Sequence, residues 1–346
     1  MTYRMPAEWE PHECTWLAWP HNEDDWPGRF GPIPWVYGEV IRHLSRRERV
    51  ELLIPAGDGP SIRSFLARLG IAEEQVRFWE MPTDRVWTRD FAPLWVFDRA
   101  GLRHALKWRF NAWAKYDDWQ RDEEAGRQIG KRFGPCVEPH HGGKLLVLEG
   151  GSIDVNGQGV LLTTEECLLS KEQQRNPGLT RQDYEDLFAE YLGIEKTIWL
   201  KRGIVGDDTH GHVDDLARFV SASTIVCVVE PDRGDANYEP LQENLVILRS
   251  ATDQRGRPFR IVELPMPEPI WFDGQRLPAS YANFYIANDL VLVPTFNDLN
   301  DRLALNVLAD LFPNRQVIGI YCGDLVWGLG TLHCMTMQMP VGRLMA

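Results

Sequence analysis

Four polar residues, far apart along the chain, together could attack a cationic carbon. Cys334 lies in the small-residue turn 328–336, His212 and Asp214 lie two residues apart, and Asp90 follows a Trp-Thr-Arg run. A thiolate is a nucleophile, and an imidazole can give a proton to a leaving group and take one from water. Two carboxylates can bind a flat guanidinium through paired hydrogen bonds. These residues therefore predict covalent catalysis by Cys334 with His212 as general acid and base.

The same residues predict how the nucleophile is activated. A free thiol has a pKa of about 8.5, so a substrate cation beside Cys334 would favour its thiolate through opposite charge. On a strand, His212 and Asp214 would point to one face. Arg89, next to Asp90, would then point away on its own strand in a structural role.

Each of these residues also has an ordinary structural interpretation. Most single cysteines pack in cores, a His-x-Asp pair often arises by chance, and Glu149-Gly150-Gly151 could be only a charged turn. The combination favours chemistry more than any member does, because each member stands beside a Gly-rich or strand-end turn.

Two other classes of function compete with a cysteine enzyme. His210, His212 and Asp214 resemble the His-x-His-x-Asp ligands of metallohydrolases, but His333 is the only histidine further along the chain, and a dinuclear site needs more ligands. A non-catalytic guanidine- or polyamine-binding protein would use the acidic residues and the tryptophans. It would leave the thiol and the imidazole unexplained.

Composition bounds the alternatives further. The chain has 346 residues, 44% apolar and 25% charged, which is typical of a globular protein of one large or two medium domains. Its net charge of −13 disfavours nucleic acid and is compatible with a small cationic substrate. The six scattered cysteines include no Cys-x-x-Cys pair, so no zinc knuckle or redox dithiol is expected. A homo-oligomer is compatible with the sequence.

The chain shows neither an apolar leader nor a run of eighteen apolar residues. We therefore expect no membrane partner and a location in a reducing cytoplasm.

Apolar spacing indicates alternating helices and strands. Helices are expected from Asp183 to Leu192 with a capping box at Thr180, over 303–311 after a cap near Asn300, and over 35–47. Strands are expected over 50–54, 145–148, 160–163, 225–229 and 290–293, with a hairpin turn at 156–157.

The elements repeat as a polar turn, a strand, a hairpin, a second strand and often a helix. The five turns are marked by Asp90, Glu149, His212, Asn283 and Cys334. Modules arranged radially would bring these turns to one central site. An ordinary α/β domain of alternating strands and helices fits the pattern equally well.

Six motifs in this order resemble the agmatine deiminases, which group with the bacterial type of peptidyl-arginine deiminase in the guanidine-modifying superfamily. The motifs extend over nearly the whole chain and lie at 5–13, 15–20, 87–90, 148–153, 207–215 and 332–336. The resemblance implies a single catalytic domain over 1–346, a five-bladed α/β propeller (pentein) with pseudo-fivefold symmetry. It also implies hydrolysis of agmatine to N-carbamoylputrescine and ammonia through an amidino-cysteine, without a metal or organic cofactor.

By the same resemblance, Cys334 matches the nucleophile, His212 the general acid and base, and Asp90 and Asp214 the guanidinium-binding carboxylates. Further substrate contacts are expected from Trp87, Glu149, Asp208, Asp298 and Gly330. The chain departs from the family pattern at Phe91-Ala92, Leu329 to Thr331 and His210. These departures line or shape the site, so peptidyl arginine and free arginine remain alternative substrates.

Overall fold

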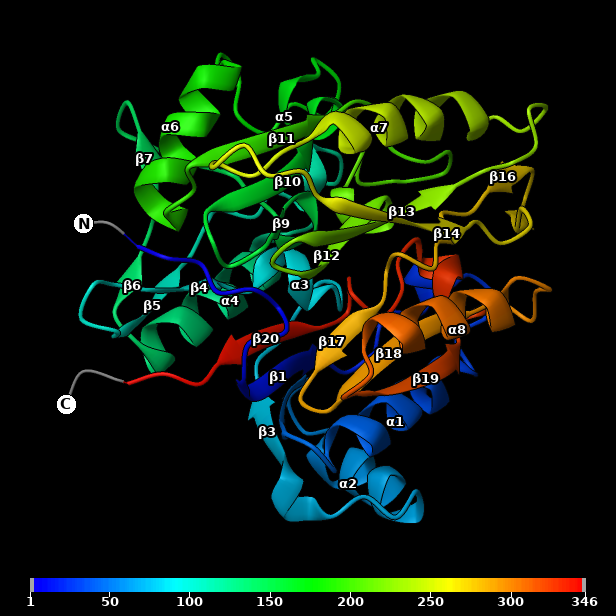
Figure 1. The fold of residues 1–346 in the computed structure, drawn as a ribbon. Helices are drawn as coiled ribbons and strands as arrows, with labels where there is room; N and C mark the ends of the chain where they lie inside the picture. Colours follow the sequence, from blue (N-terminus) through cyan, green and yellow to red (C-terminus); the bar gives the residue numbers. More distant parts are fainter. Residues whose placement is uncertain (1–2, 344–346) are drawn as a thin grey trace.

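Five small sheets of one construction make up the protein (Figure 1). The computed structural model describes residues 3–343. In each sheet an antiparallel pair is extended by a parallel strand. The strands are β20 (Met337–Pro340), β1 (His12–Ala18), β2 (Arg49–Ile54) and β3 (Val76–Glu80); β4 (Leu94–Phe97), β5 (Arg103–Leu106) and β6 (Cys136–Val137); β9 (Asp154–Val155), β10 (Val160–Thr164) and β11 (Lys196–Leu200); β12 (Ala217–Ser221), β13 (Thr224–Val229) and β14 (Arg260–Pro265); and β17 (Tyr285–Ala287), β18 (Leu290–Thr295) and β19 (Gln316–Tyr321).

Helices connect the parallel neighbours, because parallel strands need a crossover connection. The crossover helices are α1 (Ile33–Leu44), α2 (Gly59–Arg68), α4 (Gln120–Phe133), α5 (Glu165–Leu169), α6 (Arg181–Leu192), α7 (Tyr238–Ser250) and α8 (Asp301–Leu311). Smaller elements are the hairpins β7–β8 (His140–His141, Lys144–Leu145) and β15–β16 (Trp271–Phe272, Gln275–Arg276), and the 3-10 turns η1 (Glu23–Asp25), η2 (Glu73–Gln75), η3 (Ala112–Ala114) and η6 (Leu325–Gly328). Within residues 3–343, no helix is both long and apolar enough to cross a membrane.

A short turn precedes the first strand of each sheet, and these turns touch in a closed ring. They are α3 (Thr88–Phe91), η4 (Gly150–Ser152), η5 (Val213–Asp215), the loop 280–283 and the turn 332–335. Hydrogen bonds or packing join consecutive turns, and the Arg89 N–H donates to the Cys334 carbonyl (3.1 Å) to join the last turn to the first.

This ring confirms the radial arrangement and the five-bladed α/β propeller. Strand β20 pairs antiparallel with β1, so the two ends of the chain share one sheet. The five marker residues of the sequence repeat all lie in or beside the central turns. The alternative of an ordinary alternating α/β sheet is wrong.

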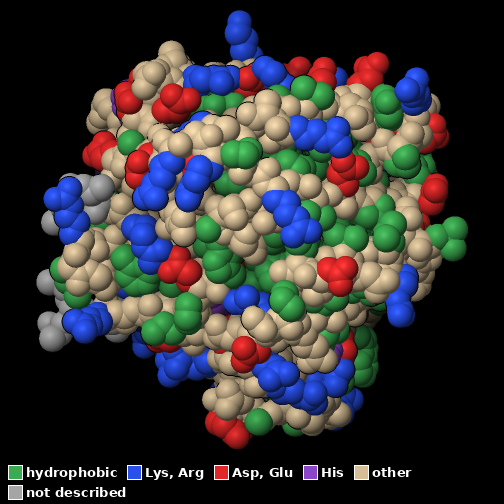
Figure 2. All heavy atoms as spheres, in the orientation of Figure 1, with side chains coloured by type: hydrophobic (Ala, Val, Ile, Leu, Met, Phe, Trp, Pro, Cys, Tyr) green, Lys and Arg blue, Asp and Glu red, His purple; other side chains and the backbone are tan. Residues whose placement is uncertain are grey.

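Most of the expected elements are present with small shifts of their ends. The capping box of α6 forms through Thr180 and Asp183, and the hairpin at 156–157 joins β9 to β10. The expected strand over 145–148 is largely absent. Val147 forms only an isolated bridge with Arg109, and its N–H donates to the Asn176 side chain (2.9 Å) instead of to a neighbouring strand. Acidic, basic and apolar side chains are interspersed on the face shown in Figure 2.

Candidate active site

The central ring brings one polar group from each turn into a small buried volume. Asp90 comes from α3, Glu149 directly precedes η4, Asp214 lies on η5, and Asn283 and Cys334 come from the last two turns. All five are at most 7% exposed. Side chains up to 244 residues apart in the sequence therefore share one site (90 to 334).

His212 and Asp214 lie on a helical turn, which corrects the expected strand. His212 is the N-cap of η5, and both Gly211 and His212 donate backbone N–H bonds to Asp207 Oδ2 (2.7 and 2.9 Å). These hydrogen bonds hold the backbone in a turn, so it does not pair with a neighbouring strand. The turn still directs both side chains inward, with His212 Nδ1 3.9 Å from Asp90 Oδ1 and 4.0 Å from Asp214 Oδ1.

Arg89 was also expected on a strand, but it lies on the short helix α3. Its guanidinium is buried, 3.3 Å from Glu8 Oε2, and donates to Gln338 Oε1 (2.8 Å). Arg89 therefore joins the central turn to both ends of the chain, away from Asp90.

A point beside the Gly151 backbone is surrounded by three polar atoms. A Cβ built on Gly151 would lie 2.5 Å from His212 Nδ1 and 3.0 Å from both Asp214 Oδ2 and Asp90 Oδ1. Glycine at 151 therefore lets these three groups pack directly against the backbone. The arrangement provides two carboxylates and an imidazole around one small volume.

The carboxylate of Asp90 is fixed in orientation by two neutral donors. Its Oδ1 accepts from the Gly151 N–H (3.1 Å), and its Oδ2 accepts from Trp113 Nε1 (2.8 Å). Burial and the negative charges of Asp214 and Glu149, opposed by His212, raise the pKa of Asp90 to about 6.

Asp214 is fixed by a hydrogen-bond chain that the sequence did not reveal. His333 Nδ1 lies 2.7 Å from Asp214 Oδ2, and His333 Nε2 lies 2.7 Å from Glu8 Oε2. Burial would raise the pKa of Asp214, but the His333 hydrogen bond and the nearby positive charges keep it below the usual value. Within residues 3–343, Asp214 Oδ1 has no hydrogen-bond partner.

The Cys334 thiol lies against Asn283 and Asp214. Its Sγ is 3.2 Å from Asn283 Nδ2 and 3.8 Å from Asp214 Oδ2. Burial and the carboxylates of Asp214, Asp215 and Asp90 raise the thiol pKa well above its ordinary value. The thiol is therefore neutral until a cation reaches these carboxylates.

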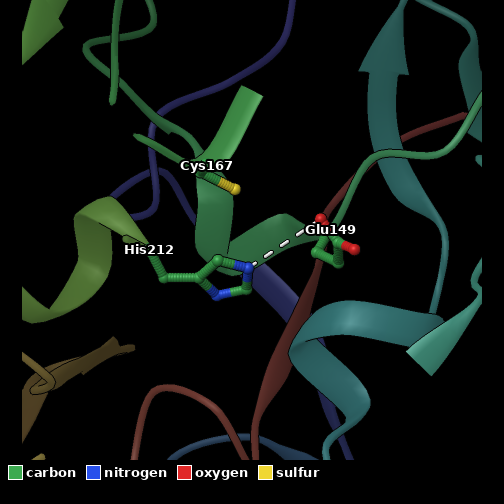
Figure 3. Close-up of side chains that lie close together, drawn as sticks. All are labelled: Glu149, Cys167 and His212. Atoms are coloured by element: carbon green, nitrogen blue, oxygen red, sulfur yellow. Dashed lines mark ion pairs between the residues drawn. The ribbon is translucent and has the colours of Figure 1, made fainter. Parts of the chain in front are cut away.

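The imidazole of His212 faces carboxylates on both sides. Its Nε2 lies 3.8 Å from Glu149 Oε2, opposite the Asp90 side (Figure 3). Burial would lower the pKa of His212, but Asp90, Cys167 and Glu149 outweigh burial and raise it well above the ordinary value. His212 is therefore an imidazolium near neutral pH, ready to donate a proton.

Glu149 has a permanent cationic partner. Arg175, fully buried, donates from Nε to Glu149 Oε1 (3.0 Å) and from Nη2 to the Thr209 carbonyl (2.5 Å). Burial would raise the pKa of Glu149, but Arg175 and His212 lower it to about 2. Glu149 thus supports the imidazole as a fixed negative charge.

A cavity of about 350 Å³ leads from the surface to Cys334 and Asp90. Its lining includes the aromatic residues Trp87, Trp113, Tyr116, Phe272 and Trp327. Gly330 lies against the ring of Trp87, where an added Cβ would approach to 2.8 Å.

The two acidic residues expected at the distal end of the substrate differ in position. Asp208 lines the cavity, but its carboxylate is bonded by Lys115 and by the Tyr116 hydroxyl (2.7 Å). Asp298 is not among the lining residues. Its carboxylate accepts hydrogen bonds from the backbone N–H groups of Glu268 (3.0 Å) and Asn300 (2.7 Å). The expected substrate contact is therefore wrong, and Asp298 instead stabilises the turn before α8.

His210 does not join His212 and Asp214 in a ligand cluster. Its Nε2 lies 3.1 Å from the Ser170 hydroxyl. Among the described residues, the His, Cys, Asp and Glu side chains close enough to share an ion are instead Glu149, Cys167 and His212.

Sequence reasoning missed Glu8, Trp113 and Arg175 as parts of the site. It named Asn283 only as a turn marker and gave His333 no role. The position of His333 directly before Cys334 could have indicated that it belongs to the site. Arg175 lies in a loop beyond α5 and reaches Glu149 only through the fold.

Comparisons with known proteins give one consistent relationship. The profile of the Porphyromonas-type peptidyl-arginine deiminases matches residues 4–340. A candidate agmatine deiminase of Selenomonas ruminantium is 37% identical, over 98% of this chain and 96% of the relative.

Solved structures agree. The agmatine deiminase of Enterococcus faecalis, described as catalysing its reaction, superimposes with a TM-score of 0.88 at 31% identity, over 98% of this chain and 96% of that one. A cysteine-to-serine variant of C. jejuni agmatine deiminase with substrate bound gives a TM-score of 0.87 at 31% identity, over 98% and 97%.

Proposed function

The chain belongs to the Porphyromonas-type peptidyl-arginine deiminase family, and we propose on this premise that it hydrolyses agmatine to N-carbamoylputrescine and ammonia. The observation that carries the proposal is the cavity that reaches Asp90 and the Cys334 thiol, where His212 Nδ1 lies 3.9 Å from Asp90 and the thiol lies 3.8 Å from Asp214. A planar cation bound between the carboxylates would present its carbon to the sulfur.

In the first half-reaction the substrate supplies the charge that the thiol lacks. Binding of a guanidinium offsets the negative charges that raise the pKa of Cys334, and the thiol proton leaves to water. The thiolate forms a bond to the guanidinium carbon. The imidazolium of His212 then protonates one amino group, and the carbon–nitrogen bond breaks to release ammonia and leave an amidino group on sulfur.

The second half-reaction uses the same groups in the reverse sense. Neutral His212 takes a proton from water, and the resulting hydroxide adds to the amidino carbon. The carbon–sulfur bond then breaks, the hydroxyl proton passes to the sulfur, and the ureido product leaves. The net reaction consumes one water, and the proton lost from Cys334 at the start is taken up by ammonia in solution.

The charge of the cavity favours a substrate with a second cation. Of the described residues that line it, five are acidic and one is basic: Asp24, Asp25, Asp90, Asp118 and Asp208, against Arg85. Arg85 already donates to the Asp118 carbonyl (2.6 Å) and carboxylate (2.8 Å). The terminal amine of agmatine suits this cavity better than the carboxylate of free arginine, which calls for a basic partner.

An ammonia-release assay with agmatine, free arginine and an arginyl peptide tests the proposal. We expect agmatine to give the highest kcat/KM. Cys334→Ser should lose turnover while keeping its thermal transition, whereas Cys136→Ser, on β6, should stay active. Turnover by Cys334→Ser would reject the nucleophile, and a preference for either arginine substrate would reject agmatine.

Two further measurements separate the competing classes. Mass spectrometry of His212→Ala mixed with agmatine should show an adduct on Cys334, because the second step lacks its base. Activity should survive dialysis against a chelator. Loss of activity that returned with added metal would favour a metallohydrolase, and affinity without product would indicate a binding protein.

A further inference from the structure

A second thiol lies beside the imidazole of the site. Cys167 is on α5, whose N-cap Thr164 accepts from the Cys167 N–H (3.0 Å) and donates to the Gly211 carbonyl (2.6 Å). These two bonds tie the thiol-bearing turn to the residue before His212. Figure 3 shows the sulfur and the Glu149 carboxylate near the same edge of the imidazole.

Two atoms of this cluster have an unused capacity for bonding. Within residues 3–343, neither Glu149 Oε2 nor His212 Nε2 has a hydrogen-bond partner, although both residues are at most 1% exposed. Most buried polar atoms are hydrogen-bonded, so such atoms call for an explanation. Both atoms lie in the group formed with Cys167 Sγ.

The spacing of the three groups is close to that of a metal site. Their potential ligand atoms all lie within 4.8 Å of one another, and Glu149 Oε2 is 3.8 Å from His212 Nε2. In a tetrahedral zinc site with bonds of about 2.0–2.3 Å, ligand atoms are about 3.3–3.8 Å apart. Sulfur, imidazole and carboxylate would need to move by about 1 Å or less to bind one ion.

The local charge also favours a dication. Arg175 occupies Glu149 Oε1 and leaves Oε2 free. Asp90 and Asp214 lie about the other ring nitrogen of His212. Three carboxylates and a thiolate would thus surround the imidazole against one guanidinium. A thiolate–imidazole set selects zinc over magnesium or calcium, which prefer oxygen ligands.

We propose that Glu149, Cys167 and His212 bind a thiophilic divalent cation such as Zn²⁺, and that this binding inhibits the enzyme. The metal would accept electron pairs from oxygen, sulfur and nitrogen, and the thiol and imidazolium would each release one proton to water. His212 would then be unable to protonate the leaving ammonia. The inhibition rests on the proposed function, whereas the binding does not.

Cobalt binding tests the site without any turnover. The Cys334→Ser protein, which lacks the other thiol of the site, is equilibrated with Co²⁺ and followed by its thiolate-to-cobalt absorption. We expect one Co²⁺ per chain, competed by Zn²⁺. Adding Cys167→Ser should abolish the absorption band and weaken Zn²⁺ binding by at least about tenfold, whereas adding Cys136→Ser should change neither.

The thermal transition of each variant verifies folding, and Glu149→Gln in the Cys334→Ser protein serves as a second test if Cys167→Ser does not fold. It should also weaken Zn²⁺ binding. Absence of Co²⁺ binding by folded Cys334→Ser protein, or a band that persists without Cys167, would overturn the site.

Ammonia release then tests inhibition in the otherwise unchanged enzyme. Zn²⁺ should inhibit it and the Cys136→Ser variant equally, and a chelator should restore activity. Inhibition of Cys167→Ser should need at least about tenfold more Zn²⁺. Equal inhibition of Cys167→Ser would place the inhibiting metal elsewhere and overturn the proposal. An enzyme inactive on agmatine would reject the proposed function but leave the cobalt result standing.

Discussion

Asp90 and Glu149 are fully buried and face the same imidazole, but their surroundings move their pKa values in opposite directions. Burial and neighbouring negative charge raise the pKa of Asp90 to about 6. At Glu149 the guanidinium of Arg175 overcomes burial and lowers the pKa to about 2. One carboxylate has its guanidinium built into the fold, and the other has only neutral donors. Under the proposed function, the substrate would supply Asp90 with the guanidinium that Glu149 already has in Arg175.

Removing the charge of Asp90 should have the largest effect. Asp90→Asn keeps the side-chain shape but leaves the substrate cation without one buried partner. Because breaking a buried ion pair costs about 3–5 kcal/mol, we expect kcat/KM for agmatine to fall by about 150- to 5000-fold. Asp310→Asn on the exposed face of α8 should have no effect. If Asp90→Asn were as active as the unchanged enzyme, Asp90 would not bind the guanidinium.

Filling the space beside Asp90 should have the next largest effect. The added methyl group of Gly151→Ala would meet His212 Nδ1 at 2.5 Å and displace the site. A displacement of about 1 Å can cost 100-fold in rate, and we expect a loss of that order in kcat. Gly31→Ala is the matched control, since its Cβ would meet no atom within 4 Å. Full activity of Gly151→Ala would show that catalysis does not need the close packing of these groups against Gly151.

The raised pKa of Asp90 predicts an acid limit to activity. Below about pH 6 this carboxyl takes up a proton, while Glu149 stays ionised and the substrate guanidinium stays charged. The pH profile of kcat/KM should therefore fall by about tenfold per pH unit below that value. Circular dichroism at each pH controls for unfolding. A flat profile to pH 5 would reject ionised Asp90 as a requirement.

Weakening the ion pair between Arg175 and Glu149 should have the smallest effect on activity. Arg175→Lys keeps the positive charge but loses the fixed geometry of the guanidinium. Loss of about one hydrogen bond, or about 1 kcal/mol, should reduce kcat about fivefold and lower the free energy of unfolding by a similar amount. Kinetics and urea unfolding measure these effects. A loss as large as that of Asp90→Asn would show that the two carboxylates are not distinguished by their partners.

The sequence predicted the repeat of turns because each module reuses the same local pattern of polar turn, hairpin and crossover. It also grouped Cys334, His212, Asp90 and Asp214, which the structure brings to one buried site; their roles remain proposals. Local rules failed where side chains compete with the backbone, as when Asp207 accepts the N–H groups that a strand at His212 would have used.

Other parts of the site were not predictable from local patterns. The contact of His333 with Glu8 spans 325 residues, and only the closed ring brings the two together. Asp298 and Asp208 both read as acidic turn residues. Their difference, a helix start in one case and a cavity wall in the other, depends on packing between modules.

The pairing of β20 with β1 has a consequence for the nascent chain during translation. Cys334 lies three residues before the start of β20, so the ribosome makes the proposed nucleophile together with this strand. The other four turns are made earlier, but they lack the thiol that we propose as the nucleophile. Under the proposed function, the site is complete only when β20 pairs with β1.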